Sequence, residues 1–361
     1  MSGGARVALI GAARHPIAEP FAGGLEAHVW ALARGLLERG HDVTLFAGPG
    51  SDPALGVRAL DLRLPRVSDA ARADVSMPPP QWLDEHHAYL DLMLALADGR
   101  LGPFDVIHNH SLHHLPIAMA AAVGTPMLST LHTPPTPWLE SAVQVRERCD
   151  VTFAAVSEHT ARAWSHLLDD VRVVPNGVDV ARWPVGRGGG PLVWFGRLVP
   201  EKGAHLAIEA ALRAGMPIDV AGPISDTDYF AARVRPLLAR PGVRYLGHLT
   251  HQRLRAVLDG ATAAVVTPCW DEPYGLVVAE ALACGTPVCG FARGALPELL
   301  DADCGRLVGA GDVDALAAAI AMAPTLSRRA ARRRAEAVCS IEAMIDRYEA
   351  LYDELAGRVA A

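Results

Sequence analysis

The amino-acid sequence predicts an α/β fold with two doubly wound, Rossmann-like domains facing each other across a deep cleft. Three observations predict it. The chain has 361 residues, more than one hydrophobic core usually serves. Short apolar runs alternate with helical patterns, which is typical of a parallel sheet covered by helices. An apolar strand, a glycine loop and a helix open the chain at Arg6–Ile10, and the same order returns from Pro191 onward.

Composition argues against several classes of function. The formal net charge is −7 and basic and aromatic residues do not interleave, so nucleic acid is not expected as a partner. The six cysteines form no Cys-x-x-Cys pair, and Cys269, Cys284 and Cys289 lie in apolar segments. We therefore expect reduced core thiols in a cytoplasmic protein. Neither a signal peptide nor a bilayer-spanning apolar segment is evident.

The N-terminal half begins with that first strand, and Gly23-Gly24 then opens a helical pattern that ends at Glu38. The Gly-x-Gly-x-x-Gly spacing of dinucleotide-binding folds is absent. The Gly-Gly pair either lets a phosphate or sugar approach the backbone or simply makes a tight turn. Residues 49–81 predict a long loop with a short strand, followed by a helix at about Trp82–Ala97. Further parallel strands are expected at Asp42–Ala47, Asp105–His108, Pro126–Leu131, Val151–Val156 and Arg172–Val174.

Histidines gather where two of these strands end. His108, His110, His113 and His114 follow one strand, and His132 ends the next. Ligands of α/β folds bind at the carboxyl ends of the strands. Zinc is conceivable here, but neither a helical His-Glu-x-x-His nor a cysteine set accompanies these residues. The alternatives are that one or two line the cleft and the rest lie at the surface, and that His132 is a core histidine.

The glycine-rich stretch Gly186–Gly190 is a natural linker. It divides the chain into an N-terminal domain, 1–183, and a C-terminal domain, 184–341. A final helix at about 342–361 is expected to pack back on the first domain. Further strands are expected at Ile218–Ala221, Val243–Leu246, Ala263–Thr267 and Pro287–Gly290.

Two groups of cations stand out in the C-terminal half. Arg197 and Lys202 lie between the strand after Pro191 and a helix that begins near Ala204, where a diphosphate would be held by charge and helix amides. The alternative is a pair of solvated surface cations. An arginine run on a later helix could touch anionic lipid, but a solvated face is the preferred interpretation. It consists of Arg328, Arg329, Arg332, Arg333 and Arg334.

The stretch from Trp270 to Ala281 carries the most chemistry. It follows a buried strand and opens a helix, with Pro273 suited to the first turn and Gly275 allowing a ligand near the helix amides. Glu272 and Glu280 are eight positions apart, about 12 Å of helical rise. That spacing suits the two ends of one elongated ligand, although a capping acid and a solvated acid are the alternative.

Together these motifs resemble glycosyltransferase family 4, retaining group 1 enzymes of the GT-B fold. Glu272-Pro273-Tyr274-Gly275-Leu276 through Glu280 is similar to the family's Glu-x7-Glu signature. Gly196-Arg197-Leu198 with Glu201-Lys202-Gly203 resembles its phosphate-binding segment. Pro175-Asn176-Gly177-Val178-Asp179 resembles the stretch entering the interdomain linker, and Gly23-Gly24 with His28 the N-terminal glycine loop.

The resemblance implies a retaining transfer of a hexose-type sugar from a nucleoside diphosphate sugar, by family frequency a UDP-sugar, to a hydroxyl acceptor. Glu272 would hold sugar hydroxyls, Glu280 the ribose, and Arg197 and Lys202 the departing diphosphate, with His132 beside the sugar. Residues 294–298 resemble a turn whose amides contact the donor, although Ala295 replaces the family's second glycine. The full donor set is Gly23, Gly24, Gly196, Arg197, Lys202, Glu272, Tyr274, Gly275, Leu276 and Glu280. No metal or other cofactor is implied.

Other activities fit the same pattern. A nucleotide-sugar epimerase or hydrolase is one alternative, because fold does not fix function. A non-catalytic nucleotide-sugar binding protein is another. The acceptor, whether a small molecule, a glycan or lipid-linked, would contact loops near Gly11–Gly23 and Pro65–Trp82, which carry no decipherable chemistry.

Overall fold

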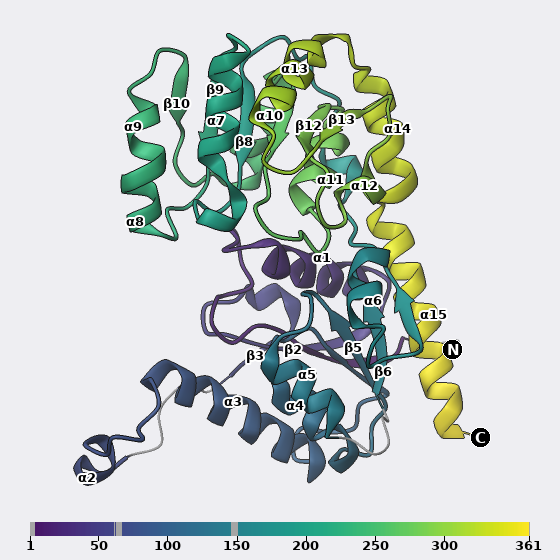
Figure 1. The fold of residues 1–361 in the computed structure, drawn as a ribbon. Coiled ribbons are helices and arrows are strands. Elements are labelled where there is room, and N and C mark those ends of the chain that lie inside the picture. Colours follow the sequence, from purple (N-terminus) through teal and green to yellow (C-terminus); the bar gives the residue numbers. More distant parts are fainter. Residues whose placement is uncertain (1–3, 61, 63–66, 146–150, 361) are drawn as a thin grey trace.

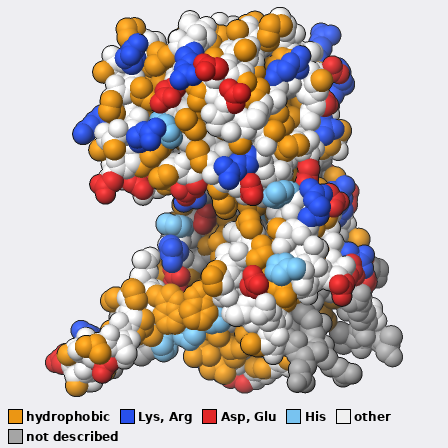
Figure 2. All heavy atoms as spheres, in the orientation of Figure 1, with side chains coloured by type: hydrophobic (Ala, Val, Ile, Leu, Met, Phe, Trp, Pro, Cys, Tyr) orange, Lys and Arg blue, Asp and Glu red, His pale blue; other side chains and the backbone are white. Residues whose placement is uncertain are grey.

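Two β-sheets, each made of parallel strands and covered by helices, form an N-terminal and a C-terminal lobe (Figure 1). A deep notch separates the two lobes (Figure 2). A computed structural model describes residues 4–60, 62, 67–145 and 151–360, with only the backbone for residues 358–360. The expected α/β fold with two Rossmann-like sheets is confirmed. Pro65, from which one expected acceptor loop starts, lies outside the described residues, as do the ends of the chain that the predicted domain ranges include.

The N-terminal lobe holds a seven-stranded sheet in the order β3-β2-β1-β4-β5-β6-β7. Its strands are all parallel. In the pair of β1 and β2, for example, Arg6 lies opposite Asp42 and Ile10 lies opposite Phe46. The strands are β1 (Arg6–Ile10), β2 (Asp42–Ala47), β3 (Val57–Ala59), β4 (Val106–Asn109), β5 (Met127–Leu131), β6 (Val151–Ala155) and β7 (Val171–Val173). The helices are α1 (Gly24–Glu38), α2 (Asp69–Arg72), α3 (Pro80–Ala97), α4 (His114–Ala118), α5 (Pro137–Gln144) and α6 (Glu158–Trp164).

The C-terminal lobe holds a six-stranded sheet in the order β10-β9-β8-β11-β12-β13, again parallel. The strands are β8 (Leu192–Phe195), β9 (Ile218–Ala221), β10 (Val243–Tyr245), β11 (Ala264–Val266), β12 (Val288–Phe291) and β13 (Gly305–Val308). The helices are α7 (Ala204–Arg213), α8 (Thr227–Tyr229), α9 (Arg235–Leu238), α10 (His251–Gly260), α11 (Leu276–Ala283), α12 (Leu296–Leu299), α13 (Val313–Met322) and α14 (Arg328–Val338). Sequence reasoning missed β13, whose four residues include a charged arginine and only two large apolar side chains.

Burial on both faces explains why these strands read as continuous apolar runs. In β1, Val7–Ile10 are all fully buried, because helices cover both sides of a parallel sheet. One N-terminal core lies under α3, α4 and α5, and the other lies under α1 and the final helix. Because the strands are parallel, their carboxyl ends all lie at one edge of each sheet, and ligands of such folds bind at this edge.

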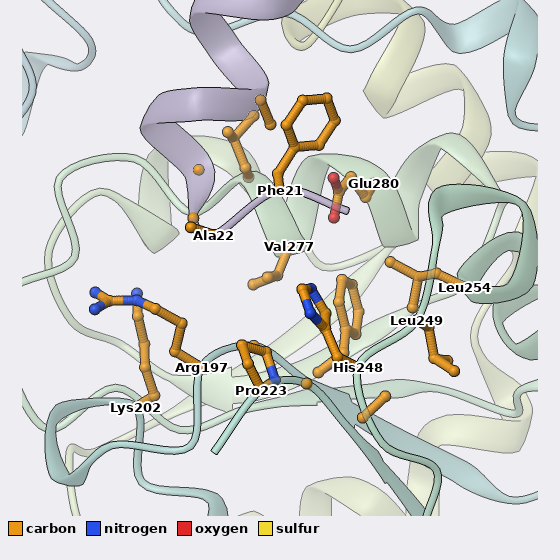
Figure 3. Close-up of a pocket in the computed structure, with 18 of the residues that line it drawn as sticks. Phe21, Ala22, Arg197, Lys202, Pro223, His248, Leu249, Leu254, Val277 and Glu280 are labelled. Atoms are coloured by element: carbon orange, nitrogen blue, oxygen red, sulfur yellow. The ribbon is translucent and has the colours of Figure 1, made fainter. Parts of the chain in front are cut away.

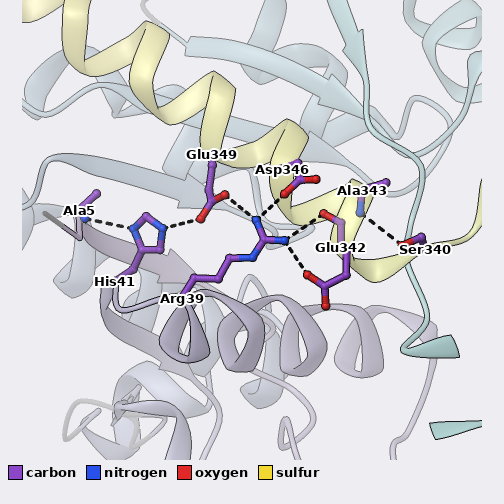
Figure 4. Close-up of polar contacts among 8 residues, drawn as sticks. All are labelled: Ala5, Arg39, His41, Ser340, Glu342, Ala343, Asp346 and Glu349. Carbon is purple, nitrogen blue, oxygen red and sulfur yellow. Dashed lines mark hydrogen bonds and ion pairs between the residues drawn. The ribbon is translucent and has the colours of Figure 1, made fainter. Parts of the chain in front are cut away.

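The final helix, α15 (Ile341–Ala360), leaves the C-terminal lobe and packs on the N-terminal sheet (Figure 1). Its buried Tyr348 and Tyr352 belong to the core that contains α1. Arg39, just after α1, forms ion pairs of 2.6 Å with Glu342, Asp346 and Glu349 (Figure 4). The helix thus ties the two lobes together by apolar packing with an ion-pair network along its edge.

The arginine run on α14 is a correction to the sequence interpretation. Arg328, Arg332 and Arg334 are half-buried and donate to main-chain carbonyls, including those of Gly186, Trp183 and Leu299. Only Arg329 and Arg333 of the run are exposed. The acceptor carbonyls lie in loops and at helix ends, where no intrahelical N–H pairs with them, and the sequence pattern could not show them.

Two further predictions around residues 269–275 were wrong. Pro273 is not in the first turn, because α11 begins at Leu276 with Gly275 as its N-cap at φ 100°. Glu272 therefore lies in a loop, and helical rise does not set its separation from Glu280. Cys269 is exposed rather than part of the core, whereas Cys284 and Cys289 are buried as expected.

The lobes are joined by two chain crossings that lie against each other. Val178, on the outgoing segment, forms a parallel bridge with Ser340 at the start of the returning segment. The hydrogen bonds run from Val178 N–H to Cys339 O (2.8 Å) and from Ile341 N–H to Val178 O (3.2 Å). In the described part of the chain, no helix has the length and apolar character needed to cross a membrane.

Candidate active site

A pocket between the lobes spans about 930 Å³, including the open solvent at its mouth (Figure 3). The N-terminal lobe contributes the segment from Phe21 to Gly24 and Ala27 of α1. The C-terminal lobe contributes loops at the carboxyl ends of its strands and the start of α11. Arg197 and Lys202 lie on one side and Glu280 on the other, so the pocket has a cationic end and an acidic end.

The cationic end combines one paired and one unpaired charge. The Lys202 ammonium forms a hydrogen-bonded ion pair with Glu272, whose carboxylate also accepts from Trp270 Nε1 at 3.2 Å. Arg197 is exposed and makes no ion pair with any described residue. A Cβ on Gly23 would lie 4.0 Å from Arg197 Nε, so this guanidinium reaches the N-terminal lobe. It is free to bind an anion with two parallel N–H groups.

The loop that carries Glu272 is held by the turn at residues 294–295. Gly294 has φ 62°, and a Cβ there would meet Glu272 main-chain atoms at 2.2–2.3 Å. Ala295 N–H donates to Glu272 O at 2.8 Å. The Ala295 amide, which the sequence interpretation expected near the donor, is thus already hydrogen-bonded, and it positions Glu272.

At the acidic end, Glu280 on α11 is 8% exposed, and burial raises the pKa of its carboxyl to about 8. His251 Nε2 lies 3.7 Å from its Oε1, and burial lowers the pKa of that imidazole. At neutral pH both groups are therefore largely uncharged. A neutral carboxyl can donate one hydrogen bond and accept others, which suits a vicinal diol such as that of a ribose.

Two helix N-termini approach each other across the pocket. A Cβ on Gly24, the first residue of α1, would lie 3.1 Å from Leu276 Cδ1 at the start of α11. Gly275 needs its left-handed φ of 100° to direct the α11 amides into the pocket. Free N–H groups and the helix dipole there favour a negatively charged ligand.

Two predicted residues lie outside this pocket lining. Tyr274 is buried, and its hydroxyl donates to Asn176 O at 2.5 Å, next to the crossing between the lobes. Half-buried His132 contacts His110, with 3.0 Å between Nε2 and Nδ1, and lies against His28 with ring centroids 5.1 Å apart. Their roles stay predictions.

Known proteins match this chain over both lobes. A model described as "Glycosyltransferase Family 4" matches residues 22–182, and one described as "Glycosyl transferases group 1" matches residues 190–337. A protein named "Glycogen synthase" from Mycobacterium tuberculosis is 30% identical over 359 residues, covering 86% of this chain and 85% of that protein. The chain is a family 4, group 1 glycosyltransferase.

A second relative of this glycosyltransferase is an "MMP alpha-(1->4)-mannosyltransferase" from Mycolicibacterium hassiacum. It is 29% identical, and the match covers 94% of this chain and 96% of that protein. Two solved structures share the fold at low identity. Sucrose-phosphate synthase from Thermosynechococcus elongatus has a TM-score of 0.78 and 22% identity, covering 98% and 100% of the two chains. AviGT4, a glycosyltransferase involved in avilamycin A biosynthesis, has a TM-score of 0.68 and 23% identity, and the match covers 98% of each chain. The GT-B fold expected from the motifs is thus confirmed.

Sequence reasoning missed part of the lining of this glycosyltransferase. Pro223 follows β9 and lies beside Arg197, whereas His248 and Leu249 follow β10 and line the pocket together with Phe21 and Leu254 (Figure 3). The signal was present, because each loop follows the carboxyl end of a parallel strand. Their ordinary residue types gave no further reason to select them.

The histidines of the N-terminal lobe separate into core and surface. His108 is fully buried between Tyr352 Oη (2.7 Å) and Thr130 Oγ1 (2.8 Å), and so ties β4 to α15. His28, His110 and His132 have ring nitrogens within 4.8 Å of one another, close enough to suggest metal ligands. However, His110 and His132 already share a hydrogen bond, which a bound metal would have to break. His113 and His114 lie further out and stack on each other at 4.4 Å.

Proposed function

We propose that this glycosyltransferase transfers a hexose-type sugar from a nucleoside diphosphate sugar, by preference a UDP-sugar, to a hydroxyl acceptor in the cytoplasm with retention of anomeric configuration. The observation that carries the proposal is the two-ended pocket of Figure 3. Arg197, Lys202 and two helix N-termini supply positive potential at one end, and the buried Glu280 lies at the other. This matches a ligand with a diphosphate at one end and a nucleoside diol at the other.

Charge development explains how the site would work. Breaking the bond between the anomeric carbon and the diphosphate oxygen leaves positive charge on the sugar and negative charge on the nucleotide. Arg197 and Lys202 would stabilise the departing diphosphate, and fixed charges that need no reorganisation are effective in this role. Glu272 is ion-paired with Lys202, so it is placed to hold sugar hydroxyls rather than to attack. We propose that these cations act without a bound metal.

The acceptor would enter from the N-terminal side. A neighbouring cavity of about 960 Å³ shares Gly23, Gly24 and Arg197 with the donor pocket. Its other walls come from the loop around Arg14 and from Glu85, Tyr89 and His113. Relatives named for glycogen, for an inositol phosphate and for phosphatidyl-myo-inositol support a small-molecule, glycan or lipid-linked acceptor.

A thermal-shift screen with UDP, GDP, ADP and TDP, followed by turnover of the matching sugar nucleotides, tests the donor. We expect one nucleoside diphosphate to stabilise the protein and its sugar to be consumed only when an acceptor is present. Conversion of the sugar without an acceptor would favour an epimerase or hydrolase, and binding without turnover a binding protein. NMR of the product decides the stereochemistry, and an inverted anomer would defeat retention.

A further inference from the structure

Four aromatic rings form a cluster on the outer face of the N-terminal lobe. Trp82 stacks on His86 at 5.1 Å, one helical turn further along α3. Trp138, at the start of α5, lies 4.9 Å from His114 at the start of α4 and 5.9 Å from Trp82. His86 and His114 are 5.6 Å apart, which closes the group. We call Trp82, His86, His114 and Trp138 the ring cluster.

The ring cluster is open to solvent. Trp138 is 56% exposed, although tryptophan is usually buried, and the other three side chains are half-buried. Figure 2 shows hydrophobic side chains gathered below the mouth of the notch, where α3 leaves the body of the lobe. Packing of the sheet does not require Trp138 at this position, because the apolar core beneath α5 is formed by Leu139, Ala142 and Val143. A tryptophan held at the surface on other rings is typical of a binding site.

A row of rings connects the cluster with the acceptor cavity. His114 stacks on His113 at 4.4 Å, and His113 stacks on Tyr89 at 4.7 Å. Tyr89 and His113 both line the cavity that shares Arg197 with the donor pocket. Three ring-to-ring steps therefore lead from exposed Trp138 to the place where the acceptor hydroxyl would meet the donor. A ligand longer than one sugar unit could occupy both.

Unpaired polar atoms accompany the rings. Asp84 Oδ1, His86 Nδ1 and His113 Nε2 have no hydrogen-bond partner among the described residues. All three atoms are buried, where an unsatisfied polar atom is costly. These side chains therefore gain by turning toward a hydroxylated ligand or its water shell, which supplies partners that a hydrocarbon chain cannot. A pyranose ring has C–H groups on its faces and hydroxyls on its rim, so it suits aromatic faces flanked by polar groups.

The local charge disfavours a membrane. Helices α3, α4 and α5 carry the ring cluster, and between them they contain Asp84, Glu85, Asp91 and Glu140 but neither lysine nor arginine. An anionic bilayer surface attracts basic segments and repels acidic ones. A neutral glycan experiences no such repulsion.

We propose that the ring cluster is a stacking subsite for an oligosaccharide acceptor, which binds a sugar unit remote from the reacting hydroxyl. This assignment rests on the proposed glycosyltransfer and specifies its acceptor as a glycan of more than one unit. Trp138 is the main contact, and Trp82 supports it. The subsite contributes affinity for long acceptors and leaves the chemistry at the donor pocket unchanged.

The test is calorimetric titration of the full-length protein with malto-, cello- and manno-oligosaccharides of increasing length. The variants are Trp138→Ala, Trp138→Phe and Leu94→Ala, the last a control at an exposed apolar residue of α3. We expect at least one series to bind the wild type more tightly as length increases. Trp138→Ala is expected to raise the Kd of the longest members about 3- to 10-fold, the scale of one aromatic contact. Trp138→Phe should recover most of that loss, and Leu94→Ala should match the wild type.

Binding of nucleoside diphosphates to the same variants separates this proposal from the donor assignment. An unchanged thermal shift with UDP shows that each variant is folded and that its donor pocket is intact, and Trp82→Ala serves as a second variant if Trp138→Ala fails to fold. The proposal is overturned if no oligosaccharide series binds while UDP does, or if Trp138→Ala binds as the wild type. It is equally overturned if Trp138→Ala instead abolishes binding to phosphatidylglycerol vesicles or dissociates an oligomer. Absence of UDP binding by the wild type would instead contradict the assignment of a UDP-sugar as the donor.

Discussion

The C-terminal wall of the cleft carries charge, whereas the N-terminal lobe holds a buried group of neutral histidine rings. Arg197 and the Lys202–Glu272 pair face the cleft from one lobe. On the other, burial lowers the pKa of His28 to about 3, and the pKa values of His110 and His132 lie well below the usual range. Charge recognises a diphosphate with little regard to the remainder of the ligand, whereas rings recognise shape. This difference explains why the donor could be inferred from motifs and the acceptor could not.

The largest effect is expected at the charged wall. Arg197→Ala and Lys202→Ala should each slow transfer about 10²-fold or more, the scale for losing a preorganised charge contact in the transition state. Steady-state kcat with a saturating donor measures the effect. Arg213→Ala, which removes an exposed ion pair with Asp314 on the same lobe, is the control and should retain normal kcat. Near-normal rates in both site variants would show that the diphosphate does not bind at this end of the pocket.

Glu280 of the charged wall and the neutral histidine rings should also respond oppositely to pH. Glu280 binds its proton up to about pH 8 when folded, but only up to its ordinary value of 4.5 when unfolded. The folded state therefore holds more protons in that range, and this group's contribution to stability falls as pH rises. Between about pH 6.5 and 8 the free energy of unfolding should decrease by the order of 2 kcal/mol in the wild type, and Glu280→Gln should flatten the decrease.

Urea unfolding across that pH range, without ligand, measures the Glu280 effect. Glu336→Gln is the matched control at an exposed acid on α14. A decrease of the same size in Glu280→Gln as in the wild type would show that Glu280 is ionised in the folded protein.

The turn behind Glu272 offers a test of positioning. Gly294→Ala places a Cβ against the Glu272 main chain and forces alanine into a left-handed φ, so the loop must shift. We expect kcat/KM to fall about 10-fold or more, because small misplacements of a site residue are costly. Gly309→Ala, where a Cβ meets nothing within 4 Å, is the control. Equal activity in the two variants would mean that Glu272 does not require this support.

The group of neutral rings can be tested at His28, which is 1% exposed and has both ring nitrogens unpaired among the described residues. Its pKa of about 3 lies below the ordinary 6.5, so the unfolded state binds more protons between these values and stability rises with pH there. His28→Leu should raise the free energy of unfolding by about 1 kcal/mol near pH 5, with less effect near pH 7.5. Urea unfolding at both pH values measures it, and His15→Leu at an exposed position is the control. Destabilisation at both pH values would indicate that the ring is needed for packing.

The smallest effect is expected from chelation. If the histidines of this group act as neutral rings, EDTA followed by dialysis should leave kcat unchanged, and added Mg²⁺ or Zn²⁺ should not raise it. Metal content by mass spectrometry serves as the control for removal. Activity that disappears with the metal and returns with it would assign the group of His28, His110 and His132 to metal binding.

Much of this architecture could be predicted from patterns along the chain. The strands, the Gly23-Gly24 helix start and the cations after β8 depend on local spacing of apolar residues and glycines, which any single segment displays. Errors arose where a long-range partner decided the outcome. Carbonyls of distant loops and helix ends bind Arg328, Arg332 and Arg334 and leave them half-buried. The turn at Gly294 packs against Glu272, which lies in a loop before α11.

The sequence alone could specify two α/β lobes and the residue types proposed to bind a nucleotide sugar, because those depend on spacing within one strand–loop–helix unit. Only the tertiary structure could bring Arg197 to Gly23 and Gly24 to Leu276, or place Trp138 against rings from α3 and α4. Such contacts join residues that are far apart along the chain, and no local periodicity encodes which of them will meet.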